Sequence, residues 1–224
     1  MEELIAQYTG ANEDERLTRQ YIAQLEFDTT IHKLTPYLLK GKSVCELGAA
    51  TGRYSLHFAK LGCDVTAVEL APDQVEILNT KVKSEGIELK VFEGNACDVS
   101  FIESSSQDVC VILGPLYHLK TLHERELAVN EALRILKPNG VLAIAYISRF
   151  FVAGMFAQQF PELVTPEVLL ELNKHGTVSN AKADSFFKVG YFATPSEIEN
   201  LVNKNGFNVI GHAGTDGFGR YISN

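Results

Sequence analysis

Short apolar runs alternate along the middle of the chain with segments whose apolar residues recur every three or four positions. The runs have the length and continuity of strands that are buried on both faces, and they lie at 43–47, 64–69, 88–92, 108–113 and 141–147. The segments between them have one apolar helical face, most clearly at 53–61, 72–84 and 121–136. Strands that alternate with helices favour right-handed crossovers and parallel pairing. The pattern therefore predicts an α/β fold with a doubly wound, mostly parallel sheet over residues 43–147.

The N-terminal flank and the stretch after the fifth strand have a different pattern. Residues 12–39 show helical periodicity with an expected break at Pro36, and they predict an N-terminal helical cap over residues 1–42. Residues 148–190 interrupt the strand–helix alternation with two helical stretches, and they predict a lid inserted after strand five. No linker divides the chain, so we expect a single domain over residues 1–224.

The C-terminal part, residues 191–224, resumes the pattern of helix and strand. Thr194 and Glu197 have the spacing of a capping box and predict the start of a helix. An apolar run at 207–213 predicts a sixth strand. The glycine-rich end has room only for a vestigial seventh strand at 220–223, and a missing C-terminal piece is the alternative.

A glycine turn follows the first predicted strand. Gly48 and Gly52 allow a sharp turn that lies close to a ligand, and the helix after it presents free N–H groups. The second strand ends at Glu69, 21 residues after Gly48, where an acidic side chain usually holds the hydroxyl groups of an adenosine ribose. The turn and the acid together predict a site for an adenosine-containing cofactor. The alternative is a tight turn between strand and helix that binds no ligand.

Two features of this turn disfavour NAD. Its glycines are spaced as G-x-x-x-G, whereas the dinucleotide fingerprint is G-x-G-x-x-G. Glu46 precedes the turn by two residues, and its charge would repel a pyrophosphate but attract a cationic aminoacyl sulfonium.

Four segments in a fixed order then suggest a family: E-L-G-A-A-T-G-R-Y-S, V-T-A-V-E-L, G-N-A and L-G-P-L-Y-H-L. With them, the chain resembles the class I S-adenosylmethionine (SAM)-dependent methyltransferases, most closely their bacterial small-molecule branch, over about residues 12–147. The resemblance implies a Rossmann-like fold, SAM as cofactor and S-adenosylhomocysteine (SAH) as product. Ala50 stands where the family usually has a third glycine, and its methyl group would tighten the methionine pocket.

The resemblance also assigns roles to particular residues. The glycine turn would approach the methionine part of SAM, Glu46 would bind its ammonium group, and Glu69 would bind both ribose hydroxyls. Asn95 replaces an Asp that commonly contacts the adenine edge, and a turn residue after Gly94 is the alternative. The implied cofactor-binding residues are Glu46, Gly48, Ala49, Gly52, Arg53, Tyr54, Glu69, Leu70, Asn95, Ala96, Leu113 and Gly114.

Tyr117 and His118 lie in the loop after strand four, which the family places beneath the transferred methyl group. Methyl transfer from a sulfonium needs an aligned donor and acceptor in a site without water more than a charged catalytic centre. His118 would act as a general base for an acceptor that must lose a proton; alternatively, it only holds the loop. Arg16, Arg19 and Tyr21 are candidate acceptor contacts in the cap, with a solvated helix face as the alternative.

Charge and composition narrow the class of partner. The formal net charge of −8 disfavours DNA and any extended nucleic-acid surface. The four cysteines lack metal-ligand spacing, so we expect reduced thiols and no metal. The acidic N-terminus and the interrupted apolar stretches predict a cytoplasmic protein that does not contact membranes.

We therefore predict methyl transfer from SAM to a small-molecule acceptor. The alternatives are a methyltransferase acting on protein or RNA, a SAM-binding protein without turnover, and an NAD-dependent oxidoreductase. The sequence indicates neither the methylated atom nor the oligomeric state.

Overall fold

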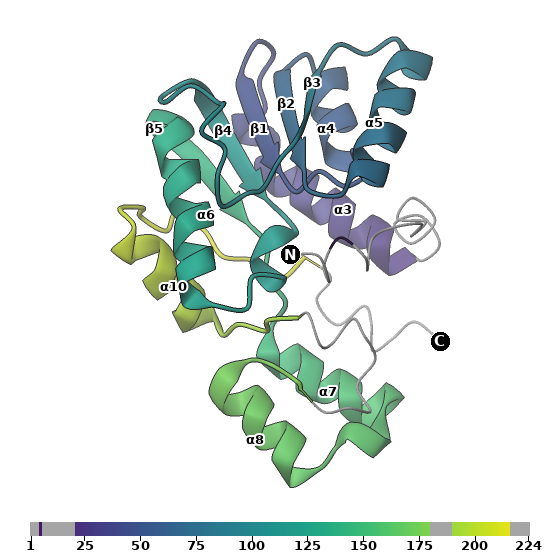
Figure 1. Ribbon diagram of the computed structural model, residues 1–224, viewed down its shortest axis with the longest axis vertical. Helices are drawn as coiled ribbons and strands as arrows, with labels where there is room; N and C mark the ends of the chain where they lie inside the picture. The colour runs from purple at the N-terminus through teal and green to yellow at the C-terminus, as the bar shows by residue number, and fades with distance from the viewer. Residues whose placement is uncertain (1–4, 6–20, 180–189, 216–224) are drawn as a thin grey trace.

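Five strands form one parallel sheet in the order β3-β2-β1-β4-β5 (Figure 1). The computed structural model describes Ile5, residues 21–179 and residues 190–215. The strands are β1 (Ser43–Leu47), β2 (Asp64–Glu69), β3 (Lys90–Glu93), β4 (Gln107–Ile112) and β5 (Leu136–Ile144). The strand order reverses between β1 and β4, and in open α/β sheets ligands bind beside this reversal, at the carboxyl ends of the strands. The predicted α/β fold is confirmed.

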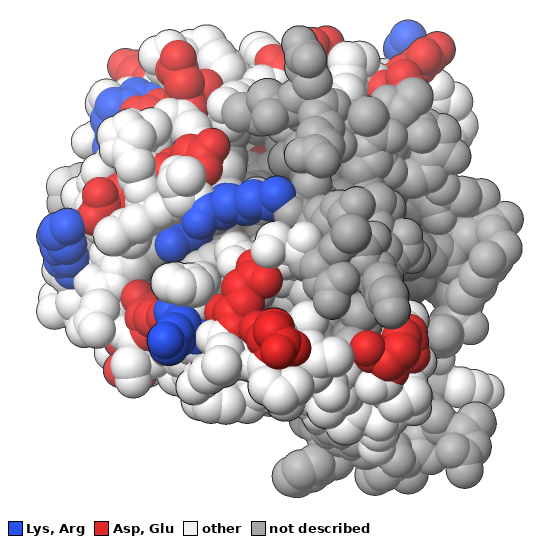
Figure 2. Space-filling view, turned by 60° about the horizontal axis from the view of Figure 1, so that its bottom comes forward, with Lys and Arg blue, Asp and Glu red and all other residues white. Residues whose placement is uncertain are grey.

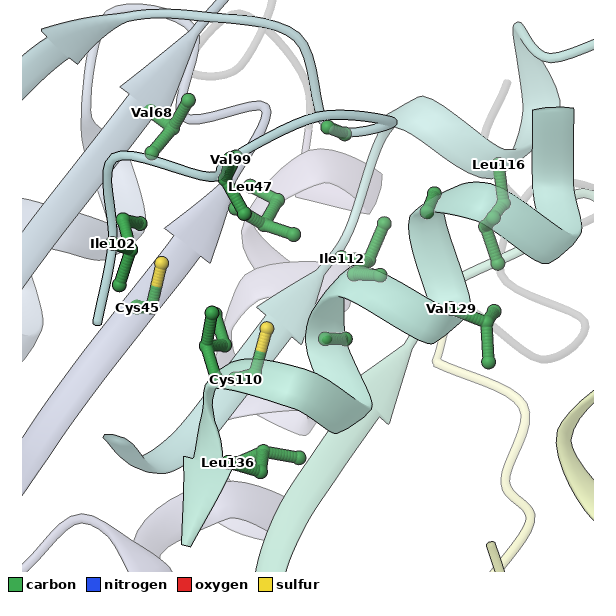
Figure 3. Packing of buried hydrophobic residues seen from close by; sticks show 14 of the residues in the cluster. Cys45, Leu47, Val68, Val99, Ile102, Cys110, Ile112, Leu116, Val129 and Leu136 are labelled. Carbon is green, nitrogen blue, oxygen red and sulfur yellow. The ribbon is translucent and has the colours of Figure 1, made fainter. Parts of the chain in front are cut away.

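Helices cover both faces of the sheet, because successive strand residues point to opposite sides. On one face, Val44 and Val109 pack against α3 (Tyr21–Leu34) and α4 (Arg53–Lys60), and α5 (Pro72–Glu85) lies beside α4. On the other face, Cys45 and Cys110 pack with α6 (Leu122–Ile135) and α10 (Pro195–Lys204). Figure 3 shows this second cluster, in which both cysteines carry free thiols.

Local signals in the sequence place several helix ends correctly. Thr121 and Thr194 form complete capping boxes at the starts of α6 and α10. Gly86 ends α5 in the left-handed conformation that favours glycine. A short 3₁₀ helix, η1 (Thr35–Tyr37), contains Pro36 and follows the last residue of α3, which confirms the predicted break.

β5 begins earlier than the sequence pattern predicts. It runs from Leu136 to Ile144 rather than over 141–147, and it includes the Lys-Pro-Asn-Gly segment expected to be a turn. Its pairing with β4 is irregular next to Asp108. Lys137 in this segment donates to Asp108 Oδ2 at 2.8 Å, and the backbone N–H of Ser43 donates to the same oxygen at 3.0 Å. Leu136 pairs with Gln107 and Val141 with Val109, so residues 137–140 bulge out of the ladder, and the Lys137–Asp108 ion pair holds this bulge against β4.

We expect Asp108→Asn to lower the free energy of unfolding by about 1–3 kcal/mol. Lys137, the backbone of Ser43 and Lys42 donate to this carboxylate, and they hold its pKa well below the usual range. Because the pKa is lower in the folded protein, the stabilisation is present above about pH 4 and is lost as the pH falls. Urea unfolding across this range measures it. A deficit that stays constant from pH 6 down to pH 2 would contradict the assignment.

The predicted sixth strand is wrong. Residues 207–213 contain no strand, and while Phe207 packs against the core, Val209 and Ile210 are exposed. An apolar run gains its strand stability from burial against neighbours, which these two side chains lack. β3 also begins at Lys90 rather than at 88. The predicted strand at 220–223 lies outside the described residues.

Two helices, α7 (Arg149–Gln159) and α8 (Pro166–His175), follow β5 and lie beyond the sheet, at the bottom of Figure 1. A 3₁₀ turn, η3 (Pro161–Leu163), joins them, and Phe156 and Leu172 are among the buried residues of their shared apolar cluster. This confirms two helices within the predicted insert, of which residues 180–189 lie outside the described part. Its action as a lid stays a prediction. None of the helices in the described ranges has the length and apolar character needed to span a bilayer.

Candidate active site

The glycine turn after β1 is held by backbone hydrogen bonds to β2. The N–H groups of Gly48 and Ala49 donate to Val68 O at 2.8 and 3.0 Å. Gly48 and Gly52 have φ angles of 82° and 84°, and Ala50 has a φ of 47°. The turn thus takes left-handed conformations at three positions, including the one where Ala50 replaces the usual glycine.

The turn also packs closely against the loop after β4. A Cβ atom on Gly48 would lie 2.5 Å from Cδ of the Pro115 ring, so no side chain fits there. A Cβ atom on Gly114 would lie 3.9 Å from Gly48 O. The predicted residues Gly48 and Gly114 therefore meet at the point where the strand order reverses. Leu113, at the start of this second loop, is half-buried.

The Glu69 side chain, at the end of β2, accepts hydrogen bonds from backbone N–H groups of two separate segments. One carboxylate oxygen accepts from the N–H of Ala50 at 2.7 Å, and the other accepts from the N–H of Ala71 at 2.8 Å. The side chain is 9% exposed. Glu69 thus fixes the glycine turn, a role that its spacing in the sequence does not reveal. Leu70, the next residue, is half-buried beside it.

Glu46 is a buried carboxyl group directly before the turn. It is 2% exposed, and the hydroxyl of Ser55 on α4 donates to its Oε2. Burial raises the pKa of Glu46 to about 8, the hydrogen bond from Ser55 opposes this shift, and the nearby charge of Glu69 adds to it. A cation that reached this carboxyl group would find a strong partner, because it would compensate a buried negative charge.

Arg53 and Tyr54, two predicted cofactor contacts, fasten the N-terminal helix to the core. The Arg53 guanidinium lies 4.4 Å from the ring centroid of Phe27 on α3, and it donates to Gln24 Oε1 at 2.9 Å. The Tyr54 ring lies 4.9 Å from the same phenyl ring, and burial raises the pKa of its hydroxyl. The cap therefore lies over the start of α4, directly after the turn.

Asn95 and Ala96 form part of a turn after β3. The Oδ1 atom of Asn95 accepts from the N–H of Cys97 at 3.0 Å, and its backbone oxygen accepts from Asp98. Ala96 is buried in the core. These contacts favour the turn interpretation of Asn95, and its contact with an adenine stays a prediction.

Tyr117 and His118 lie together in the loop after β4, in and beside the 3₁₀ helix η2 (Pro115–Tyr117). Their rings meet edge to face with centroids 4.7 Å apart. The backbone N–H of His118 donates to Pro115 O at 2.9 Å. The loop starts beside the glycine turn, so both candidate catalytic residues belong to the carboxyl edge of the sheet.

Of the three candidate acceptor contacts in the cap, the structure describes Tyr21 alone. Arg16 and Arg19 lie outside the described residues. Tyr21 is the first residue of α3, and its side chain is 95% exposed. The structure shows no contact between Tyr21 and the glycine turn, so its role stays a prediction.

Sequence reasoning missed a polar cluster next to Tyr117 that is buried except for the partly exposed Glu197. It consists of Arg125 on α6, Arg149 on α7, and Tyr191 and Glu197 before and within α10. Arg125 and Arg149 each left one local signal, an arginine within an otherwise apolar helical stretch. That signal does not identify a cluster unless the partner residues are known. Among the described residues, no group of His, Cys, Asp and Glu has the arrangement of a metal site.

Comparisons with known proteins agree with this geometry. Residues 45–144 match the family model described as a methyltransferase domain. The chain is 24% identical over 172 residues to a ubiquinone biosynthesis O-methyltransferase of Cupriavidus pinatubonensis, covering 77% of this chain and 62% of that protein.

Solved structures show the same fold. A SAM-dependent methyltransferase from Methanosarcina mazei superposes with a TM-score of 0.65 and 19% identity, covering 79% of this chain and 84% of that one. A protein from Pyrococcus horikoshii gives a TM-score of 0.62 and 21% identity, covering 87% of this chain and 89% of that one. Together with the methyltransferase-domain match, which runs over the glycine turn and into all five strands up to Ile144, these findings identify residues 45–144 as a methyltransferase domain with the fold of a SAM-dependent methyltransferase.

Proposed function

We propose that this protein transfers the methyl group of SAM to a small-molecule acceptor. The observation that carries the proposal is the pair of carboxyl groups at the switch point of the sheet. Glu46 and Glu69 stand on either side of a turn whose Gly48 has no room for a side chain. Glu46 offers a buried carboxylate to a cation, and Glu69 ends β2 where a ribose is expected. This donor set fits an adenosyl group with a cationic amino acid tail.

The residues of the site would act by binding and alignment. SAM, when bound, supplies a methyl group that is already activated for displacement. Glu46 would hold the ammonium group, and Glu69 would keep the turn in place through Ala50 while it accepts from the ribose. The Tyr117–His118 loop would present the acceptor, and His118 would take a proton from acceptors that must lose one. α3 and the 148–179 part of the insert would exclude water.

Three findings support a small acceptor. The curated relative from Cupriavidus pinatubonensis is a ubiquinone biosynthesis O-methyltransferase, whose name points to a small molecule. The chain has a formal net charge of −8. On the described part of the face in Figure 2, basic and acidic side chains are interspersed, and basic residues form no continuous tract of the kind that nucleic acids need.

The test is a turnover screen of the purified protein. Incubation with SAM and small phenols, amines, thiols and carboxylic acids should release SAH with at least one class. Bulk RNA and a protein extract serve as separate arms. Methylation confined to RNA or protein would overturn the small-molecule acceptor, and SAH binding without turnover in any arm would support a SAM-binding protein instead.

We expect Glu69→Ala to weaken SAM binding at least about tenfold, since hydrogen bonds to a charged group contribute about 1.5–3 kcal/mol. The change removes the acceptor for both Ala50 and Ala71, so the turn loses its fixed shape together with the ribose contact. Asp64→Ala is the matched control, because Asp64 lies at the opposite end of the same strand and is exposed. Calorimetric titration with SAM measures both variants. Equal affinities would remove Glu69 from the site.

A further inference from the structure

Arg125 is a buried cation whose hydrogen bonds go to the candidate catalytic loop. It is 6% exposed, and its Nη1 atom donates to Leu119 O at 2.5 Å and to Lys120 O at 2.9 Å. Its guanidinium carbon lies 3.5 Å from the ring centroid of Tyr191. Burial lowers the pKa of Arg125, so the two carbonyls and the aromatic face offset a substantial desolvation. Arg125 on α6 thus binds the C-terminal end of the loop after β4 by hydrogen bonds.

Tyr191 holds the same loop from the other side. Its backbone N–H donates to Tyr117 O at 2.7 Å, while its ring lies against Arg125 and its hydroxyl donates to Glu197 at 3.3 Å. The side chain is buried. Arg125 and Tyr191 therefore contact each other and also hold carbonyl groups on both sides of His118.

Tyr191 is in turn joined to the insert. Arg149, the first residue of α7, donates to Phe192 O at 3.0 Å and to Asn173 O of α8 at 2.7 Å. Its Nη2 atom also donates to both carboxylate oxygens of Glu197, at 2.9 Å to Oε1 and 2.8 Å to Oε2. A continuous set of buried and part-buried contacts therefore runs from the insert through 191–192 to the loop after β4.

We propose that Arg125 and Tyr191 are positioning residues that set the place of Tyr117 and His118 at the acceptor side of the site. The proposal rests on the proposed function of that site. Nothing in it requires either residue to touch SAM, because their partners are the carbonyls of residues 117, 119 and 120, which lie beyond the part of the loop that packs against the glycine turn. Their loss should disturb the acceptor side and leave cofactor affinity intact.

Three variants and one matched control test this. Arg125→Lys removes the planar guanidinium that lies on the Tyr191 ring, Tyr191→Leu removes the aromatic face, and Tyr191→Phe keeps the ring and the backbone N–H. Arg134→Lys is the control, because Arg134 lies on the same helix and donates to the carbonyls of Ile102 and Val99, far along the chain from the loop. All four are compared with the wild type for SAH affinity by calorimetry and for the ¹H–¹³C imidazole signal of His118, assigned with His118→Gln.

We expect the His118 signal to shift in Arg125→Lys and Tyr191→Leu, with SAH affinity within about twofold of the wild type. The signal should stay in place in Tyr191→Phe and in Arg134→Lys, although Arg134→Lys also loses part-buried hydrogen bonds of the guanidinium. Should one of the first two variants fail to fold, the other carries the test. An unchanged His118 signal in a folded variant that lacks the guanidinium or the ring would overturn the proposal. Absence of SAH binding by the wild type would instead overturn the proposed function.

Discussion

Gly48→Ala is expected to abolish measurable SAM binding and to lower the free energy of unfolding by about 2–4 kcal/mol. Two separate effects add up. The φ of 82° at this position disfavours any residue with a Cβ atom. In addition, the new Cβ would lie 2.5 Å from Cδ of Pro115, and a proline ring cannot rotate away. The clash is relieved only if the glycine turn and the loop after β4 move apart. Both segments belong to the candidate site, so this movement disrupts it.

Gly41→Ala separates the two effects. Gly41 has the same φ of 82°, but a Cβ atom there would meet nothing within 4 Å. It should therefore show the conformational penalty alone, about 1–2 kcal/mol, with SAM affinity retained. Urea unfolding and calorimetric titration of both variants provide the comparison. If the two variants were equally stable and bound SAM equally well, the close contact between Gly48 and Pro115 would have no role in the site.

The second large effect is on the pH dependence of SAM binding. Without cofactor, the buried Glu46 carboxyl group has a pKa of about 8, so it is mainly protonated at neutral pH. An ammonium group beside it would favour the carboxylate and lower that pKa, so binding releases a proton. Affinity should therefore rise about tenfold per pH unit from pH 6 and level off near pH 8. Glu46→Gln, which cannot ionise, should bind weakly with a flat profile.

The raised pKa of Glu46 also sets the direction in which the stability of the protein changes with pH. The same burial makes ionisation of Glu46 unfavourable in the cofactor-free protein, whose stability is lost as the pH rises from the unfolded value of about 4.5 towards 8. Bound SAM should reverse this loss. Calorimetry in two buffers with different ionisation enthalpies counts the released protons directly. Zero proton release at pH 7 by the wild type would show that Glu46 does not face the ammonium group.

The sequence predicted the parts of the fold that depend on burial and local capping. β1 and β2 have the predicted bounds because both are continuous apolar runs buried on two faces. The capping boxes at Thr121 and Thr194 needed only neighbours three residues away. The failures depend on distant partners. The run at 207–213 has strand composition without a buried face, and β5 starts early because Leu136 pairs with Gln107 of β4 ahead of the bulge at 137–140.

The site divides in the same way. Glycines with positive φ and the acidic end of β2 leave a signal in spacing, so the sequence predicts the turn at Gly48 and Gly52 and the acid at Glu69, while their contacts with SAM stay a prediction. The backbone partners of Glu69 and the stacking of Arg125 on Tyr191 leave none, because they join residues that are close only after folding. Arg53 and Tyr54 are expected at the cofactor from their place beside the turn; the structure shows both in contact with Phe27 of α3, and their contact with the cofactor stays a prediction.

The most direct test of the central claim is a calorimetric titration of the wild-type protein with SAH, with NADH as the control ligand. We predict saturable binding of SAH with a dissociation constant in the micromolar range, which corresponds to a binding free energy of about −8 kcal/mol. NADH should give no heat of binding. This result would show that the turn after β1 and Glu69 form a site for the adenosyl amino acid. Binding of NADH without binding of SAH would contradict the account, because the same turn and acid would then serve a dinucleotide.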